Sequence, residues 1–272
     1  MMMICEFNCL PLHNVCIYIF FKKRTIIARR KKNAASVRLL SFSLENVLVF
    51  VSILISTFLC VHAMPDYGNP SYWDERYAAR GPTEQFDWYQ DFSRLKDLIV
   101  SNANNDVKNC EVLLPGCGNS PFPGHLYDHG FKNLTCIDVS TVVVQQQTER
   151  YKNFDTIEFL VGDCLNLDYI PDECFDLIIE KALGDAVLCG DNSFSNIARL
   201  NNEMYRVLKP GGVYLSVSHG VPQTRVTHLQ SENRQWTVDY KAISKPLIVG
   251  FDEGNDASDS HFIYVCRKND GK

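Results

Sequence analysis

The first residues in this sequence whose types and spacing suggest chemistry are two glycines, Gly116 and Gly118, which follow a predicted strand at residues 111–114. Glycines at the end of a strand let the backbone turn tightly and approach a ligand without interference from a side chain. Loops of this kind bind nucleotides at the edge of open α/β sheets. A Gly-x-Gly pair alone is more often an ordinary turn, so the interpretation depends on further residues.

Two acidic residues supply that support. Asp138 ends the second predicted strand, 20 positions after Gly118, which is the spacing of a carboxylate that accepts hydrogen bonds from both hydroxyls of a ribose. Asp163 ends the third predicted strand, where it could accept from the amino group of adenine while Cys164 packs against the ring. The structural alternatives are a helix cap for Asp138 and a turn residue for Asp163. We predict a nucleoside-binding site that includes both glycines.

The loop lacks the third glycine of a dinucleotide-binding site. A G-x-G-x-x-G loop would have glycine at position 121, where this chain has Pro121. The three-glycine loop is typical of proteins that hold a pyrophosphate. Its absence favours a ligand without a pyrophosphate over a nicotinamide dinucleotide.

Short apolar runs alternate with helical stretches along residues 64–272, which is the pattern of an α/β fold. Strands are predicted at residues 111–114, 134–137, 157–161, 177–179, 213–217 and 262–266. Helices are predicted at residues 92–99, 142–150 and 197–207, the last ending before the breaker cluster at 209–212. We expect a Rossmann-like, seven-stranded, mostly parallel sheet with helices on both faces.

Two stretches, residues 175–188 and 207–215, resemble the fourth and fifth strands of Rossmann-like, S-adenosylmethionine-dependent methyltransferases. Upstream, SYWDERY at residues 71–77 and FDWYQDF at residues 86–92 resemble segments of the elongation factor 1-alpha lysine methyltransferases, a family that includes the methyltransferase-like 13 proteins. Further matches are GCGNS at 116–120, STVVV at 140–144, Glu180 and Lys181 with Asp185, and Trp236. The resemblance covers nearly all of residues 64–272.

The resemblance implies a protein-lysine N-methyltransferase that uses S-adenosylmethionine and acts on an elongation factor 1-alpha-like protein. It implies cofactor contacts from Trp73, Tyr77, Trp88, Gly116, Asp138 with Val139, Asp163 with Cys164, and Glu180. Aromatic faces near a sulfonium would stabilise its charge by cation–π attraction; core packing of an N-terminal helix is the alternative for these three aromatic residues.

Methyl transfer to an amine requires alignment of donor and acceptor and exclusion of water, and it needs no metal. We expect Glu180 to hold either the amino-acid part of the cofactor or the incoming ammonium. Two other functions stay open: a small-molecule methyltransferase of the same fold, and a non-catalytic binding module. The intact set of Gly116, Gly118, Asp138 and Asp163 favours an enzyme.

The charge of the chain is unevenly distributed. Residues 1–63 contain eight of the 27 Lys and Arg and two of the 32 Asp and Glu, which leaves 19 basic and 30 acidic residues, a net charge of −11, in residues 64–272. Such a domain repels phosphate backbones, so we expect no nucleic-acid substrate. A protein substrate with a basic surface is compatible with this charge. Solubility alone is the alternative explanation for this charge.

The eleven cysteines include no C-x-x-C pair, so we expect reduced thiols and a cytoplasmic location.

Residues 1–63 differ in composition from the rest, with a basic stretch at 22–38 and a 15-residue apolar run at 47–61. A spanning helix needs roughly 20 apolar residues. The segment is a membrane anchor, a cleaved signal, or a leader upstream of a true start at Met64; we favour the last, and expect membrane contact only if residues 47–61 are a real anchor. The expected domains are therefore an N-terminal extension at 1–63 and a methyltransferase domain at 64–272, in which residues 64–105 form an aromatic cap.

Overall fold

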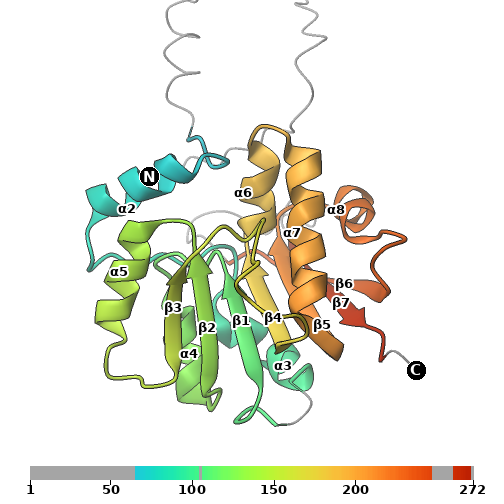
Figure 1. The fold of residues 1–272 in the computed structure, drawn as a ribbon, viewed down its shortest axis with the longest axis horizontal. Helices are drawn as coiled ribbons and strands as arrows, with labels where there is room; N and C mark the ends of the chain where they lie inside the picture. The colour runs from blue at the N-terminus through green and yellow to red at the C-terminus, as the bar shows by residue number, and fades with distance from the viewer. Residues whose placement is uncertain (1–64, 104–105, 247–259, 271–272) are drawn as a thin grey trace, which may run out of the picture. The chain divides into compact units, whose positions relative to one another are not determined.

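Seven strands form one mixed sheet in the computed structural model of the chain, which describes residues 65–103, 106–246 and 260–270 (Figure 1). The strands are β1 (Glu111–Pro115), β2 (Asn133–Asp138), β3 (Ile157–Val161), β4 (Phe175–Lys181), β5 (Leu208–Ser218), β6 (Trp236–Ser244) and β7 (Ser260–Lys268). Their order across the sheet is β3-β2-β1-β4-β5-β7-β6. β1 to β5 are parallel, and β7 is antiparallel to both of its neighbours. The predicted Rossmann-like, mostly parallel sheet is confirmed.

All six strands predicted from apolar runs are present, and two differences have a physical cause. β5 begins at Leu208, before the predicted start at residue 213, because Leu208 pairs with Phe175 ahead of an irregularity in the ladder. β6 was not predicted: it is an edge strand that pairs only with β7, and of its nine residues only Trp236 is buried. A strand with so little buried surface has no continuous apolar run.

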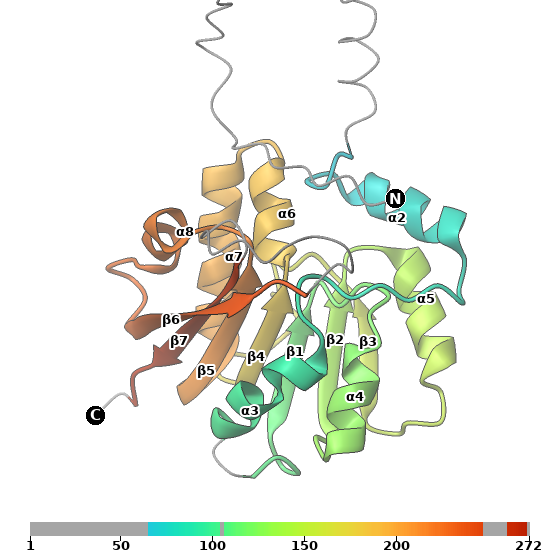
Figure 2. The same cartoon turned by 180° about the vertical axis from the view of Figure 1, so that it is seen from behind.

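Seven helices are described, on both faces of the sheet: α2 (Pro70–Arg80), α3 (Phe92–Ser101), α4 (Phe122–His129), α5 (Thr141–Arg150), α6 (Leu183–Cys189), α7 (Ser193–Val207) and α8 (Pro222–Leu229). Figure 1 shows α7 in front of the sheet, and Figure 2 shows α3 and α4 on the opposite face. The predicted helices correspond to α3, α5 and α7. The short helices α4, α6 and α8 were not predicted, because seven or eight residues leave few periodic positions.

The apolar core has one layer on each face of the sheet. Val112 and Leu114 of β1 pack with Leu95 of α3 and Leu126 of α4. Leu113, between them, belongs to the layer that packs against α7. Successive side chains of a strand point to opposite faces, so burial of both faces requires the continuous apolar runs that made the central strands visible in the sequence.

Three helices near the carboxyl ends of the parallel strands begin at polar caps. The side-chain oxygens of Asn69, Asp91 and Ser140 accept backbone N–H groups at the starts of α2, α3 and α5. Such caps satisfy donors that the first turn of a helix leaves without a partner. They fix where α2 and α5, which contact each other, enter the region around the glycine loop.

The proposed extension at residues 1–63, including the apolar run at 47–61, lies outside the described residues. Within residues 65–103, 106–246 and 260–270, no helix is both long enough and apolar enough to cross a membrane.

Candidate active site

The glycine loop leaves β1 in a conformation that requires glycine. Gly116 and Gly118 have φ angles of 62° and 53°, in the left-handed region that residues with a Cβ rarely adopt. Space is also limited, because a Cβ on Gly116 would lie 3.0 Å from Cδ1 of Leu183 at the start of α6. The loop therefore brings bare backbone to the carboxyl edge of the sheet, as the sequence predicts.

Asp138 lies beside this loop at the end of β2. Its Oδ2 accepts the backbone N–H of Gly118 at 2.9 Å, and its Oδ1 accepts that of Ser140 at 3.0 Å. Burial raises the pKa of Asp138 to about 6, although these two hydrogen bonds oppose the shift. Each carboxylate oxygen retains accepting capacity for one further donor, and a pair of ribose hydroxyls would supply two.

The other predicted nucleoside contacts follow β2 and β3. Cys164 is buried, and burial raises the pKa of its thiol, although a backbone hydrogen bond from Gly116 opposes the shift. Asp163 is exposed, and its Oδ1 accepts the backbone N–H of Leu165 at 2.9 Å. Val139 is half-buried. The structure thus groups Gly116, Asp138 and Cys164 closely and leaves Asp163 at the rim.

The three predicted aromatic residues form a row from the glycine loop outward. Tyr77 of α2 is buried against the loop, Trp73 stacks on Tyr77 with ring centroids 5.9 Å apart, and Trp88 meets Trp73 edge-on at 6.3 Å. A cation already contacts this row, because the guanidinium of Arg76 lies 5.9 Å from the Trp73 ring and 5.8 Å from the Trp88 ring. These aromatic residues therefore pack against one another and also make cation–π contacts, here with Arg76.

Two residues that were not predicted hold the aromatic segment onto the sheet. Asp74 of α2 accepts the hydroxyl of Ser140, two residues after Asp138, at 2.5 Å. Asp87 accepts the Ser120 hydroxyl at 2.7 Å and pairs with the buried ammonium of Lys181 in β4. Neither aspartate lies at a strand end, so strand-end spacing gave no signal for them.

Glu180 lies on the α7 side of the sheet and is 2% exposed. Its Oε2 accepts the backbone N–H of Leu183 at 2.8 Å, and its Oε1 accepts the hydroxyl of Ser216. Burial raises the pKa of Glu180 to about 7, and the nearby carboxylate of Asp185 adds to the shift. The expectation that Glu180 holds the cofactor or the incoming ammonium stays a prediction.

Asp185, in the first turn of α6, is the centre of a second polar cluster. Its Oδ1 accepts from Ser218 at 2.6 Å and from Nη2 of Arg225 at 2.8 Å, and its Oδ2 accepts the Tyr89 hydroxyl at 2.8 Å. Burial opposes ionisation, yet hydrogen bonding and charge from His219, with the charge of Arg225, hold the pKa of Asp185 well below its usual range. Of these residues only Asp185 was singled out from the sequence, because its partners come from three distant segments.

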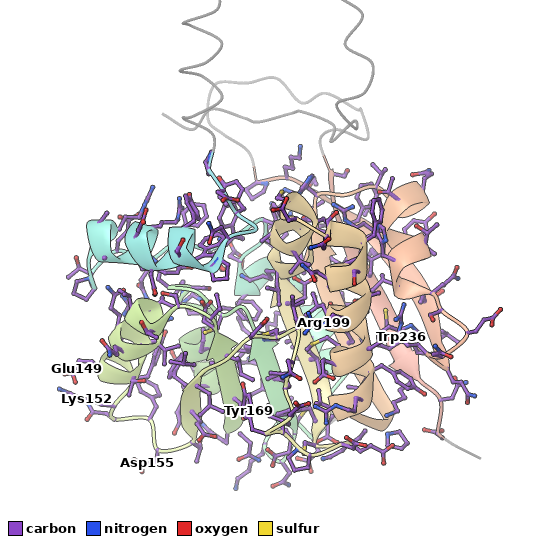
Figure 3. All side chains as sticks on the ribbon, turned by 45° about the horizontal axis from the view of Figure 1, so that its top comes forward. Glu149, Lys152, Asp155, Tyr169, Arg199 and Trp236 are labelled. Atoms are coloured by element: carbon purple, nitrogen blue, oxygen red, sulfur yellow. The ribbon has the colours of Figure 1, made fainter. Side chains whose placement is uncertain are left out.

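Trp236, which contributes to the sequence resemblance, lies at the other end of the sheet. Its ring stacks on Tyr214 at 5.8 Å, and Nε1 donates to the carbonyl of Leu229 at 3.0 Å. Figure 3 shows it beside α7, on the side of the domain opposite α2 and α5. Its place in this structure is in the core under α7 and α8.

Known proteins share this fold and sequence pattern. The profile of a family described as a methyltransferase domain matches residues 106–260. The chain therefore belongs to the methyltransferase domain family. It is an S-adenosylmethionine-dependent methyltransferase of the Rossmann-like class.

Two groups of relatives agree with that class. The chain is 28% identical over 186 residues to the mouse protein named EEF1A lysine methyltransferase 4, a match that covers 65% of this chain and 71% of the relative. It is 33% identical over 156 residues to the mouse protein named eEF1A lysine and N-terminal methyltransferase, covering 56% of this chain and 22% of that longer protein.

Solved structures show the same fold at low identity. The N-methyltransferase NodS from Bradyrhizobium japonicum, bound to S-adenosyl-L-homocysteine, superposes with a TM-score of 0.52 at 18% identity, covering 72% of this chain and 98% of NodS. The [4+2]-cyclase SpnF superposes with the same score at 19% identity, covering 71% of this chain and 91% of SpnF. Because the two are named for different reactions, these likenesses show the fold alone.

The residues present fit the cofactor. The glycine loop offers bare backbone, and the buried Asp138 carboxylate has two acceptor positions for hydroxyl donors. When bound, S-adenosylmethionine supplies an electrophilic methyl group on a sulfonium. Among the described residues, no group of three His, Cys, Asp or Glu is arranged to hold a metal ion.

Proposed function

We propose that this chain is a protein-lysine N-methyltransferase whose substrate is an elongation factor 1-alpha-like protein. The observation that carries the proposal is the 186-residue match to a relative named as an EEF1A lysine methyltransferase, since it extends over 71% of that relative. The second group of relatives, also named for eEF1A lysine, supports the same substrate class.

Charge supports a protein substrate with a basic surface. Residues 64–272 carry 30 acidic and 19 basic residues, so the domain attracts a cationic partner and repels nucleic acid. This attraction is screened by salt. Methylation of a basic protein is therefore expected to slow as ionic strength rises, without a matching change in cofactor affinity.

We assign the cofactor to the carboxyl edge of the sheet. Gly116 and Gly118 provide the backbone surface, and Asp138 accepts the ribose hydroxyls. The remaining assigned contacts are Val139, Asp163, Cys164, Glu180, Trp73, Tyr77 and Trp88. Support comes from the close grouping of Asp138, Cys164 and Tyr77 around the loop.

The acceptor must reach this site as a neutral amine. Lysine carries a proton at neutral pH, and that proton must leave before nitrogen can form a bond to carbon. The chain's own task is therefore to hold the lysine, exclude water and accept the proton. We place the enzyme in the cytoplasm, because its eleven cysteines include no C-x-x-C pair and reduced thiols are typical of that compartment; fractionation of the full chain tests this location.

The test is methylation by the full chain with isotopically labelled S-adenosylmethionine and recombinant elongation factor 1-alpha, followed by peptide mass spectrometry. We expect label on the Nζ atom of a lysine, lost with Asp138→Ala. Asp155→Ala is the matched control, because Figure 3 shows Asp155 at an outer corner of the domain, away from α6 and α7. Label transferred only to small molecules would overturn the protein-substrate proposal, and absence of cofactor binding by the folded chain would overturn the assigned site.

A further inference from the structure

Three side chains form a closed hydrogen-bonding triangle beside the ends of β4 and β5. The Tyr89 hydroxyl lies 2.8 Å from Oδ2 of Asp185 and 2.8 Å from Nδ1 of His219. Nδ1 of His219 lies 2.9 Å from the same Oδ2. The three groups come from the segment before α3, from α6 and from the residue after β5, so only the folded chain assembles them.

The hydrogen bonds of this triangle determine that Nδ1 of the His219 imidazole carries a hydrogen atom. Asp185 is ionised, because the guanidinium of Arg225 and the hydroxyl of Ser218 both donate to its Oδ1, and so it only accepts. Burial, followed by the charge of Asp185, raises the pKa of Tyr89 far above its usual value, so the phenol keeps its proton. If that proton pointed at His219, Nδ1 and Oδ2 would face each other as two acceptors at 2.9 Å. The consistent arrangement has Tyr89 and Nδ1–H of His219 both donating to Oδ2.

With hydrogen on Nδ1, the neutral imidazole of His219 has its lone pair on Nε2. The side chain of His219 is 57% exposed, whereas that of Asp185 is 5% exposed. Asp185 already accepts from Ser218, Tyr89, Arg225 and the backbone N–H of His219. The buried carboxylate is therefore filled by the chain's own donors, and the accessible base of the cluster is Nε2 of His219.

The position of the triangle relates it to the cofactor edge. Tyr89 directly follows Trp88, with ring centroids 6.1 Å apart, and Trp88 continues the aromatic row through Trp73 to Tyr77 at the glycine loop. His219 directly follows the last residue of β5. In open α/β sheets, ligands bind at the carboxyl ends of the strands. Tyr77, at one end of the aromatic row, lies at the loop after β1, and Tyr89, at the other end, contacts His219 after β5.

We propose that His219 is the catalytic base that takes the proton from the methyl-accepting amine, with Asp185 and Tyr89 as positioning residues. This inference rests on the proposed function, in which the acceptor is a lysine ammonium. The N–H bond of the ammonium breaks and its proton goes to Nε2. The freed lone pair of nitrogen forms the new C–N bond while the C–S bond of the donor breaks and its electron pair stays on sulfur. The imidazolium then releases its proton to solvent through its exposed side.

Several other titratable or charged groups lie near His219, and a pH-dependence measurement must distinguish their effects from that of His219. They are Asp185 of α6, Tyr89 before α3, Arg225 of α8 through its contact with Asp185, and His261 of β7, whose ring lies 4.7 Å from that of Tyr89. Burial, with charge from Lys245 and His219, lowers the pKa of His261 to about 4. His261 is therefore neutral at the neutral pH at which the role of His219 is tested.

The first test needs no substrate. In the full chain labelled with ¹⁵N-histidine, NMR should show the neutral imidazole of His219 in the Nδ1–H tautomer, and Tyr89→Phe with Asp185→Asn should weaken that preference. His125→Asn, on α4, removes one histidine signal away from the triangle and is the assignment control. An Nε2–H tautomer in the wild-type chain would overturn the inference even with no substrate identified.

The second test is the single-turnover rate as a function of pH. His219→Asn keeps an N–H near the position of Nδ1 but removes Nε2, so the rate at neutral pH should fall about 100-fold or more while the Kd of S-adenosylmethionine is unchanged. The variant's rate should continue to rise at high pH, where the wild-type rate is level. A variant as fast as the wild type would overturn the role of His219 and leave the lysine proposal intact. A wild-type chain that methylates no lysine would instead overturn the proposed function.

Discussion

Gly118 and Tyr77 are fitted to each other across two segments of the chain. A Cβ on Gly118 would lie 2.8 Å from the hydroxyl oxygen of Tyr77, and the next nearest atom, Cζ of the same ring, would lie 3.8 Å away. The glycine loop can therefore accept the aromatic cap only because position 118 has no side chain. The glycine loop and the helix α2 that carries Tyr77 therefore form one fitted surface.

Two different penalties are expected for Gly118→Ala. The left-handed backbone costs about 1–2 kcal/mol for a residue with a Cβ, and contact with Tyr77 adds to it. Tyr77→Phe removes the close oxygen but not the backbone strain. We expect Gly118→Ala to weaken S-adenosylmethionine binding at least tenfold and the double variant to recover part of this loss, as measured by calorimetry. Equal affinities for the single and double variants would show that the hydroxyl does not limit position 118.

Cofactor binding is expected to depend on the protonation of Asp138. Its pKa is raised to about 6, so the free enzyme gains a proton there as the pH falls below 6. Ribose hydroxyls donate to the carboxylate form, and the proton therefore competes with the cofactor. The Kd should rise about tenfold between pH 7 and pH 5. Asp138→Asn should bind weakly with no such dependence; a pH-independent wild-type Kd would contradict the assigned role of Asp138.

Glu180 should leave a signature in the pH dependence of stability. Its pKa is raised from 4.5 to about 7, so the folded state favours the neutral form, and the stability this provides is lost as the pH rises from 4.5 to 7. Glu180→Gln mimics the neutral form. Its free energy of unfolding relative to the wild type should increase by up to about 3 kcal/mol over that range, as measured by urea denaturation.

The same variant tests the predicted contact of Glu180 with cofactor or ammonium. We expect weaker cofactor binding or slower turnover in Glu180→Gln. Unchanged kinetics together with the stability gain would confine Glu180 to the packing of α6 and β5.

Breaking the buried pair of Lys181 and Asp87 should destabilise the chain strongly. Their side chains are 8% and 16% exposed, so Lys181→Met leaves an uncompensated carboxylate at a cost of about 3–5 kcal/mol. The double variant Lys181→Met with Asp87→Asn should lose less than the sum of the single variants. Additive losses in chemical denaturation would show that the two charges act independently.

An exposed pair provides the matched control for that measurement. Lys152 pairs with Glu149 at 2.5 Å, with side chains 59% and 73% exposed, and Figure 3 shows both at the outer end of α5. Lys152→Met should change the free energy of unfolding by no more than about 0.5 kcal/mol.

Local signals were sufficient for the central sheet and the turn of the glycine loop. β1, β2 and β4 are largely buried on both faces, so their apolar runs identify them without tertiary information. β3 is an edge strand with no fully buried residue, yet four of its five residues are apolar, which was enough to predict it. Gly116, Gly118 and Asp138 were predicted because a tight turn and a strand-end carboxylate each follow a strand at a fixed spacing. Such spacing is measured along the chain, so it can be read from the sequence without the tertiary structure.

The edge strand β6 and the short helices α4, α6 and α8 lacked comparable signals. β6 is mostly exposed, and each of these helices has at most eight residues. Their formation depends on the elements that they contact: β6 pairs with β7, α6 and α8 contact α7, and α4 contacts α3 and β2. Neighbours distant in sequence supply the stabilisation that local propensity does not.

The sequence by itself determined the methyltransferase class, the order of the central strands along the chain and the tight glycine turn after β1. Only the tertiary structure decided which charges meet: Asp87 with Lys181, and Asp185 with Tyr89, His219 and Arg225. The physical reason is that a short-range hydrogen bond depends on the separation of two atoms in space. Residues 89, 185 and 219 acquire that proximity only when the parallel strands place their carboxyl ends at one edge of the sheet.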